Sequence, residues 1–262
     1  MAHTIIRPAA DANKDAIACI HYEALEQYNR FYQVFFVNQV QDSLLKATHK
    51  ALQDPKTTFL VAEDSETKVI QGFIRFEKSQ PAPPAEPQPS VTPKSEQESE
   101  KDNKEKPAEA PSIWAVRKHL EPIWNKINGR CDDMDTIQEK TVGSQTHIYI
   151  RHLMISPEWQ RRGVGTKLLN TVLAQADAEG IPCYIVSSAE SQNLYLKSGF
   201  EDLGTWHIDN EHWAKEIVHT EKELDMQGNE WLVEEFAGVG EVEKCMVKWP
   251  KKAEQRQDVV DK

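Results

Sequence analysis

The segment with the strongest chemical character is 160–166, Gln-Arg-Arg-Gly-Val-Gly-Thr. It lies between 147–155, a run rich in β-branched and aromatic residues typical of a strand, and 167–179, where apolar residues recur at helical spacing. The first amides of a helix lack partners and carry partial positive charge, and glycines let a bulky anion approach them. On glycine spacing alone, two interpretations stay open: a seat for a phosphate group, or a plain strand-to-helix turn with solvated arginines.

Two familiar phosphate motifs are excluded in this segment. No glycine precedes Gly163 at the distance that G-x-x-x-x-G-K-[ST] requires, and Leu168 occupies the third glycine position of G-x-G-x-x-G. The pattern that fits is Q/R-x-x-G-x-G/A after a strand. A second pattern follows at 189–200, where a helix is expected to end in Y-x-K-x-G-F. Together the two patterns resemble those of the GCN5-related N-acetyltransferases.

This resemblance implies a fold, a reaction and a set of cofactor contacts. The fold is mixed α/β: a mostly antiparallel, twisted central sheet, flanked by helices, whose fourth strand carries a bulge and splays from the fifth. The reaction is direct transfer of an acetyl group from acetyl-CoA to a primary amine, with no metal. A freed amide of Met154 or Ile155 would polarise the thioester carbonyl. The residues expected to bind acetyl-CoA are Leu153, Met154, Ile155, Gln160, Arg161, Arg162, Gly163, Val164, Gly165, Thr166, Ser187, Asn193 and Lys197.

Three residues are candidates for proton transfer. Tyr195 matches the tyrosine that protonates the departing thiolate in many relatives, although a packed helix tyrosine would explain the same residue. Tyr149 stands where some relatives carry a glutamate base. Strict alternation along 147–155 places His147, Tyr149 and Arg151 on one face and His152 on the other. His147 is therefore a hypothetical base or member of a water relay, with a surface histidine as the alternative.

The acceptor is expected to be a small-molecule amine. The segment 28–36 is unusually aromatic, and its Phe31 and Tyr32 either line the acceptor pocket or belong to the core. Arg151 is a candidate to bind a carboxylate of the acceptor. Two other functions stay open: acetylation of a protein lysine or N-terminal amine, and binding of acetyl-CoA without catalysis.

Composition excludes several other classes of protein. A formal net charge of −11 and a pI near 5.4 argue against nucleic acid as a partner, and no apolar run approaches membrane-spanning length. The four cysteines are dispersed and suggest neither a zinc site nor a disulfide framework. We therefore expect a cytoplasmic protein. No sequence feature specifies its oligomeric state.

The chain is expected to form one domain over 1–250, interrupted by a disordered Pro/Glu/Lys/Ser-rich insertion at 79–111 and followed by a flexible tail at 251–262. The predicted strands are 4–8, 57–63, 69–78, 147–155, 182–188, 203–208 and 244–249. The predicted helices are 11–28, 34–53, 112–134, 167–179, 189–200 and 211–223, with 129–145 as a polar connector.

Overall fold

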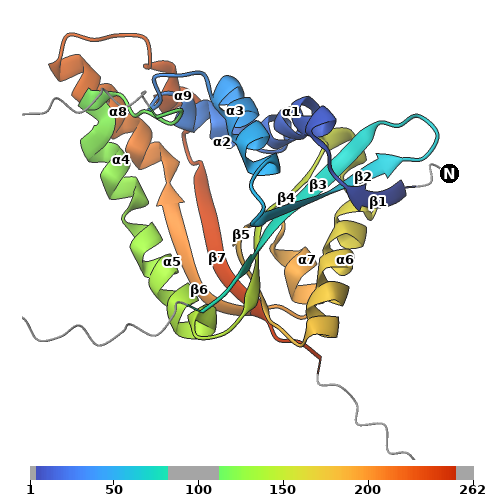
Figure 1. Cartoon of the computed structure of the whole chain (residues 1–262). Helices are drawn as coiled ribbons and strands as arrows, with labels where there is room; N and C mark the ends of the chain where they lie inside the picture. Colours follow the sequence, from blue (N-terminus) through green and yellow to red (C-terminus); the bar gives the residue numbers. More distant parts are fainter. Residues whose placement is uncertain (1–3, 82–111, 252–262) are drawn as a thin grey trace, which may run out of the picture.

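A single sheet of seven strands organises the described part of the chain (Figure 1). The computed structural model describes residues 4–81 and 112–251. The strand order is β1-β2-β3-β4-β5-β7-β6, and every neighbouring pair is antiparallel except β4 and β5. This confirms the mixed α/β fold class predicted from the sequence. The strands are β1 Thr4–Pro8, β2 Thr57–Asp64, β3 Ile70–Ser79, β4 His147–Ile155, β5 Cys183–Ser188, β6 Glu201–Asp209 and β7 Gly240–Lys248.

Helices cover both faces of this sheet. α6 and α7 pack on one face, whereas α1 and α3 pack on the other face over β2 and β3, and α5 lies against β6 and β7 (Figure 1). The helices are α1 Lys14–Ala24, α2 Glu26–Gln33, α3 Val40–Leu52, α4 Glu121–Asn128, α5 Arg130–Gln138, α6 Val164–Glu179, α7 Gln192–Lys197, α8 Asn210–Glu223 and α9 Trp231–Glu235.

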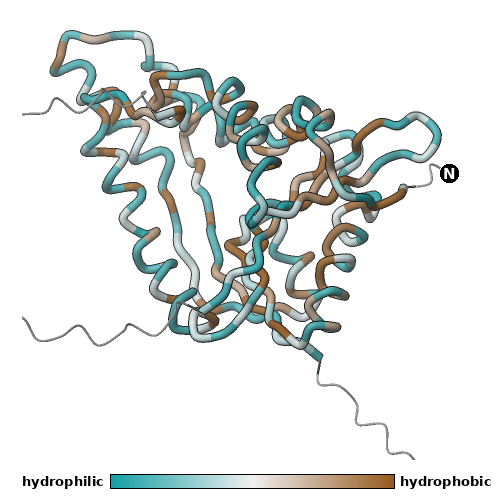
Figure 2. Tube along the Cα trace, in the orientation of Figure 1, coloured by the Kyte–Doolittle hydropathy of each residue, from teal (hydrophilic) through white to brown (hydrophobic). Residues whose placement is uncertain are grey.

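The largest core cluster forms between α6 and the centre of the sheet. Leu168, Leu169 and Val172 are fully buried there, while the opposite side of α6 is polar, as the alternating colours along this helix show (Figure 2). Burying one such side chain stabilises the fold by about 1.5 to 3 kcal/mol. Gly163 and Gly180 flank the helix, both with positive φ, which fixes where it begins and ends. The burial of α6 therefore holds its first turn against the end of β4.

Several predicted helical regions differ from the structure. The helix predicted over 11–28 is divided at Leu25 between α1 and α2, and the helix predicted over 34–53 begins only at Val40. Only part of 112–134 is helical, because α4 starts at Glu121, followed by Pro122, and the earlier residue Val116 instead forms an isolated antiparallel bridge with Phe36. Conversely, 129–145 is no simple connector: α5 and a π-helical turn, Glu139–Gly143, fill most of it. The buried Met134 anchors α5 although the helix has no continuous apolar stripe.

The sheet is continuous across the undescribed residues 82–111. β3 precedes them and β4 follows them, yet the two strands pair side by side, with Ser79 opposite His147. Most of the predicted insertion lies outside the described residues, as does 252–262 of the predicted tail. Among the described helices, none is both long and apolar enough to cross a membrane.

Candidate functional site

The strands β4 and β5 pair over three residues only. Their ladder joins Ile148 to Cys183, Tyr149 to Tyr184, and Ile150 to Ile185, and then ends. Beyond that point β4 continues to Ile155 along β3, and β5 continues to Ser188 along β7. The facing edges of β4 and β5 thus part toward their carboxyl ends, leaving peptide groups that no longer pair across the sheet. We call this region the splay.

A β-bulge at Arg151 marks the start of the splay. On β3, Phe76 pairs with Ile150 and the preceding Arg75 pairs with His152, so Arg151 is the extra residue. A bulge bends the strand and shifts the alternation of its side chains. The prediction that His152 lies on the face opposite Tyr149 was therefore wrong. His152 points toward α1, where its ring lies 4.5 Å from that of His21.

The loop before α6 leaves backbone amides free. Gly163 adopts φ 82°, and a Cβ at this position would meet no atom within 4 Å, so the space beside its backbone is open. The Lys167 amide donates to the Gly163 carbonyl at 3.1 Å. Among the described residues, the amides of Gly165 and Thr166 find no hydrogen-bond acceptor. The start of α6 can therefore accept an anion through its backbone.

Other residues of the same loop fix its position. Val164 is buried in the core, and the Gln160 side-chain amide donates to the Ile155 carbonyl at 3.1 Å. The Arg162 guanidinium lies 5.1 Å from the centre of the Trp159 ring, and Arg161 is exposed with φ 61°. The side chain of Gln160 thus ties the loop to the end of β4, while the arginines remain at the surface.

Helix α7 presents two different faces to its surroundings. Tyr195 is 2% exposed and packs edge-on against Phe200, and this burial raises the pKa of the Tyr195 phenol. Asn193 and Lys197 are exposed. Because residues two apart on a helix lie on nearly opposite sides, the structure separates Asn193 and Lys197 from the Tyr195 ring.

Serine hydroxyls line the turn between β5 and α7. Ser187 is 2% exposed. Its hydroxyl donates to the Ser188 carbonyl at 2.9 Å and lies 3.2 Å from the Ser191 hydroxyl. Ser191 precedes Tyr195 by one helical turn and acts to lower the phenol pKa, against the larger effect of burial. These hydroxyls connect the end of β5 to the start of α7.

The residues considered for the base are not gathered at the splay. His147 begins β4, before the parallel pairs, and is buried, with its Nδ1 3.0 Å from the Gln145 carbonyl. Tyr149 lies within the paired part, with its ring against that of Tyr184. The Arg151 guanidinium stacks on Tyr149 at 3.8 Å and forms an ion pair with Glu77 at 3.0 Å. Arg151 therefore already has a carboxylate partner within the chain.

The two aromatic residues considered for the acceptor lie in different surroundings. Phe31 is fully buried and packs against Phe35 and Phe236, so the structure assigns it to the core. The Tyr32 ring packs edge-on against Trp124, but its buried hydroxyl has no hydrogen-bond partner among the described residues. Of this pair, only Tyr32 brings a polar group that the fold leaves unsatisfied.

Sequence reasoning missed a pair of neutral histidines beside the bulge. Burial, assisted by the nearby Arg75 charge, lowers the pKa of His21 to about 4. Burial lowers the pKa of His152 well below its ordinary value, with further contributions from His21 and Arg75. The only sequence signal was the position of His152 next to Arg151, and strict alternation assigned it to the wrong face. Both imidazoles are unprotonated at neutral pH.

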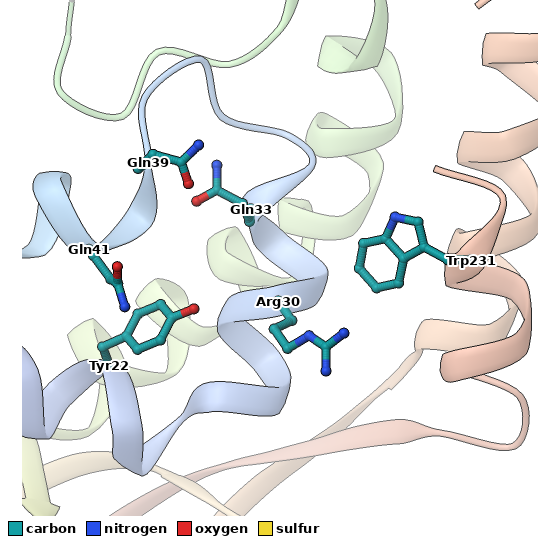
Figure 3. Close-up of a pocket in the computed structure, with 6 residues that line it drawn as sticks. All are labelled: Tyr22, Arg30, Gln33, Gln39, Gln41 and Trp231. Atoms are coloured by element: carbon teal, nitrogen blue, oxygen red, sulfur yellow. The ribbon is translucent and has the colours of Figure 1, made fainter. Parts of the chain in front are cut away.

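A separate hollow opens beside α2, away from the splay. It has a volume of about 220 Å³ and is lined by Tyr22, Arg30, Gln33, Gln39, Gln41 and Trp231 (Figure 3). Much of its polar lining is already engaged: Arg30 bonds Glu235 at 2.7 Å, and the Gln33 side chain accepts from the Val40 amide at 2.6 Å. No strand contributes to this hollow, so it is distinct from the region around the splay.

The family comparison agrees with this geometry. The model of the acetyltransferase (GNAT) family matches residues 22–200, more than half of the chain. The chain belongs to the GNAT acetyltransferase family. The match contains the bulge, the splay, the α6 loop and α7 through Phe200. As a GNAT acetyltransferase, the protein belongs to a group of enzymes that generally use acetyl-CoA.

Solved structures share the fold of this acetyltransferase at low sequence identity. One is a Corynebacterium glutamicum protein described as histone acetyltransferase HPA2 and related acetyltransferase, with 18% identity, coverage of 96% of this chain and 98% of that chain, and a TM-score of 0.51. Another is a putative arylalkylamine N-acetyltransferase 7 from the yellow fever mosquito, with 13% identity, coverage of 94% and 87%, and a TM-score of 0.53.

No curated protein sequence matches the chain. Within 4–81 and 112–251, no group of three or more His, Cys, Asp or Glu residues is arranged to hold a metal ion.

The neutral state of His21 makes the stability of the fold depend on pH. Its folded pKa is depressed from 6.5 to about 4, so between these values the unfolded chain binds the extra proton and stability falls as pH falls. We expect wild type to lose on the order of 2 kcal/mol of unfolding free energy from this residue between pH 7 and pH 5. Urea unfolding at both pH values should show a smaller loss in His21→Gln than in wild type.

The exposed His219 on α8 provides the matched control, His219→Gln. An equal pH-dependent loss in wild type and His21→Gln would show that His21 is not held neutral.

Proposed function

We propose that the protein is an acetyl-CoA-dependent N-acetyltransferase that acetylates a primary amine of a small molecule in a ternary complex. The observation that carries this proposal is the juxtaposition of two sets of free peptide groups: the amides at the start of α6 and the parted edges of β4 and β5. Gly165 joins them, since a Cβ added there would lie 3.5 Å from the Ile155 side chain at the end of β4 and 3.7 Å from the Leu194 side chain of α7. A cofactor with a diphosphate at one end and an amide-bearing arm at the other matches both.

In this proposal the backbone does most of the cofactor binding. The amides from Arg161 to Thr166 hold the pyrophosphate, and the charges of Arg161 and Arg162 complement it. The peptide groups of Leu153, Met154 and Ile155 pair with the amides of the pantetheine arm, across from Ser187. The exposed Asn193 and Lys197 of α7 reach the outer part of the cofactor. A free amide in the bulged part of β4 polarises the thioester carbonyl as negative charge develops on its oxygen.

Tyr195 is the proposed acid for the departing thiolate. Burial holds its phenol protonated at neutral pH, because the charged form is disfavoured away from water. A proton donor that remains neutral until negative charge develops on sulfur suits this step.

A small acceptor is favoured by how the acceptor side is enclosed. The Tyr28 hydroxyl donates to the Glu190 carboxylate at 2.6 Å, which ties α2 to the turn after β5. On the same side, α4, α5 and α8 pack over the half of the sheet formed by β6 and β7. The two structural relatives, one described as a histone acetyltransferase and one as an arylalkylamine acetyltransferase, include both kinds of acceptor.

Acetyl-CoA is expected to stabilise the protein against heat. At 100 times its dissociation constant a ligand contributes about 2.7 kcal/mol, which corresponds to a rise in melting temperature of about 5 °C or more in a chain of this size. Gly163→Asp should abolish the rise, because its carboxylate would stand beside the phosphate-binding amides.

The control for that variant is Gly180→Asp, at the other end of the same helix. Gly180 also has positive φ and open space around its Cβ position, so the substitution adds the same charge and a similar strain. Differential scanning fluorimetry should find the shift intact in Gly180→Asp. No shift in wild type at saturating acetyl-CoA would contradict the proposed function.

Tyr195→Phe is expected to lower kcat by at least about tenfold while leaving acetyl-CoA binding nearly unchanged, because only the proton donor is lost. Tyr184→Phe is the control, since Tyr184 is equally buried but donates to the Met134 carbonyl at 3.4 Å. Thiol release from acetyl-CoA measures the rate. Equal rates in wild type and Tyr195→Phe would remove Tyr195 from the mechanism.

The acceptor class is tested by the same thiol-release assay with a panel of acceptors. Alkylamines, arylalkylamines and amino acids are compared with peptides that carry a lysine or a free N-terminus. We expect kcat/KM to be higher for small amines than for peptides by about tenfold or more, a difference of about 1.4 kcal/mol in transition-state binding. Faster transfer to peptides than to small amines would contradict the proposed small-molecule acceptor and indicate a peptide or protein acceptor.

A further inference from the structure

A partly buried cluster of polar residues lies beyond the carboxyl end of β5, and the proposed mechanism gives it no role. Glu243 of β7 pairs with Ser188, the last residue of β5. Glu241 precedes Glu243 by two residues, and because β7 runs antiparallel to β5, Glu241 lies beyond the end of β5. Tyr32 approaches from α2, and Asn210 comes from the start of α8. We call Tyr32, Asn210 and Glu241 the acidic pocket.

The charges around this pocket do not balance. Arg130 of α5 binds Glu243 through its Nε at 2.6 Å and its Nη2 at 3.1 Å, so this pair is internally compensated. Glu241 forms no ion pair among the described residues; its nearest donor is the Asn210 side-chain amide at 2.6 Å. Burial raises the pKa of the Glu241 carboxyl, as expected for a carboxylate without a cationic partner. One negative charge is left over.

Two hydrogen-bond acceptors beside that charge are also unused. Asn210 is fully buried, and its Oδ1 has no partner among the described residues, although its Nδ2 is bonded to Glu241. The Tyr32 hydroxyl lies toward the Glu241 carboxylate and makes no other hydrogen bond among the described residues. A buried polar atom without a partner costs about 1 to 3 kcal/mol. A water molecule would satisfy these atoms but would leave the charge, whereas an alkylammonium group supplies three N–H donors and one positive charge.

The pocket is too far along the sheet to hold the reacting nitrogen. β4 and β5 part after Ile185, and from there Ser188 is three residues away and Glu241 two residues further. At about 3.3 Å per residue this amounts to roughly 16 Å along the strands. The thioester, by contrast, is proposed to lie between β4 and β5 near the bulge. A cation at Glu241 must therefore belong to another part of the acceptor.

We propose that the acceptor is a linear diamine or polyamine, whose second, unreactive ammonium group is bound by Glu241, Asn210 and Tyr32. The proposal rests on the proposed acetyltransferase function and names its substrate class. The ammonium donates hydrogen bonds to the Glu241 carboxylate and to the Asn210 side-chain carbonyl, and the Tyr32 hydroxyl oxygen accepts its third hydrogen bond. The intervening methylene chain spans the distance to the reacting amine.

The test compares linear diamines of four to ten carbons with amino alcohols of the same lengths, which lack only the second charge. Thiol release is measured with wild type, Glu241→Gln, Tyr32→Phe and the control Glu66→Gln, an equal charge change at the exposed β2–β3 turn. We expect wild type to prefer the longer diamines over the matched amino alcohols in kcat/KM. Glu241→Gln should raise KM for these diamines at least tenfold with little change in kcat, and leave the amino alcohols unaffected.

Tyr32→Phe should act in the same direction, and Glu66→Gln should have no effect. Binding of the same ligands to each variant with CoA present, measured by calorimetry, gives a readout that does not require turnover. An equal loss of kcat/KM for diamines and amino alcohols in Glu241→Gln, or no preference for diamines in wild type, would contradict ammonium binding at the acidic pocket. Either result would leave the proposed transfer to amines intact. Absence of transfer to every amine, with acetyl-CoA bound, would contradict the proposed function, and the calorimetric comparison would still decide the pocket.

Discussion

The structure depends on a constraint in the middle of its sheet: two parallel strands that pair for three residues and then separate. In a fully paired sheet, the peptide groups of neighbouring strands bond to each other. A binding site made of backbone groups therefore requires that the hydrogen bonding between two strands end early. Here each strand keeps a partner on its outer edge, β3 for β4 and β7 for β5, which lets the inner edges part without unravelling the sheet. The bulge at Arg151 lies where the separation begins. The packing of α6 then brings free amides to the same place.

Much of this arrangement could be predicted from the sequence, because it follows from short-range patterns. The strand 147–155 was predicted at its observed position and the helix after it ends where predicted, since β-branched residues, a proline and glycines bound them clearly. The helix begins at Val164, three residues earlier than predicted, because its first turn lies within the segment 160–166 that was expected to be loop. The β4–β5 pairing and the family were predicted from the resemblance. The predictions failed where tertiary contacts decide. The helical state of 130–138 depends on the burial of Met134, and the extended state of Val116 depends on its bridge to Phe36.

The candidate site shows the same division. The loop 160–166 was found because glycines and arginines at that spacing have few other uses. The orientation of His152 was missed because one extra residue in a strand reverses every side chain after it, and a bulge leaves no mark in the periodicity of this sequence. The acidic pocket was not foreseen at all. Its members come from three elements that only the fold brings together, and each alone is an ordinary tyrosine, asparagine or glutamate.

The bond between Tyr28 and Glu190 has a consequence for how the binding of one substrate affects the binding of the other. Glu190 lies in the turn that leads to Tyr195, whereas Tyr28 belongs to a helix on the opposite, acceptor side. If one substrate changes the affinity for the other through this bond, thermodynamic reciprocity requires that the second substrate change the affinity for the first by the same factor. The two substrates would then bind cooperatively, with the same coupling free energy whichever of them arrives first.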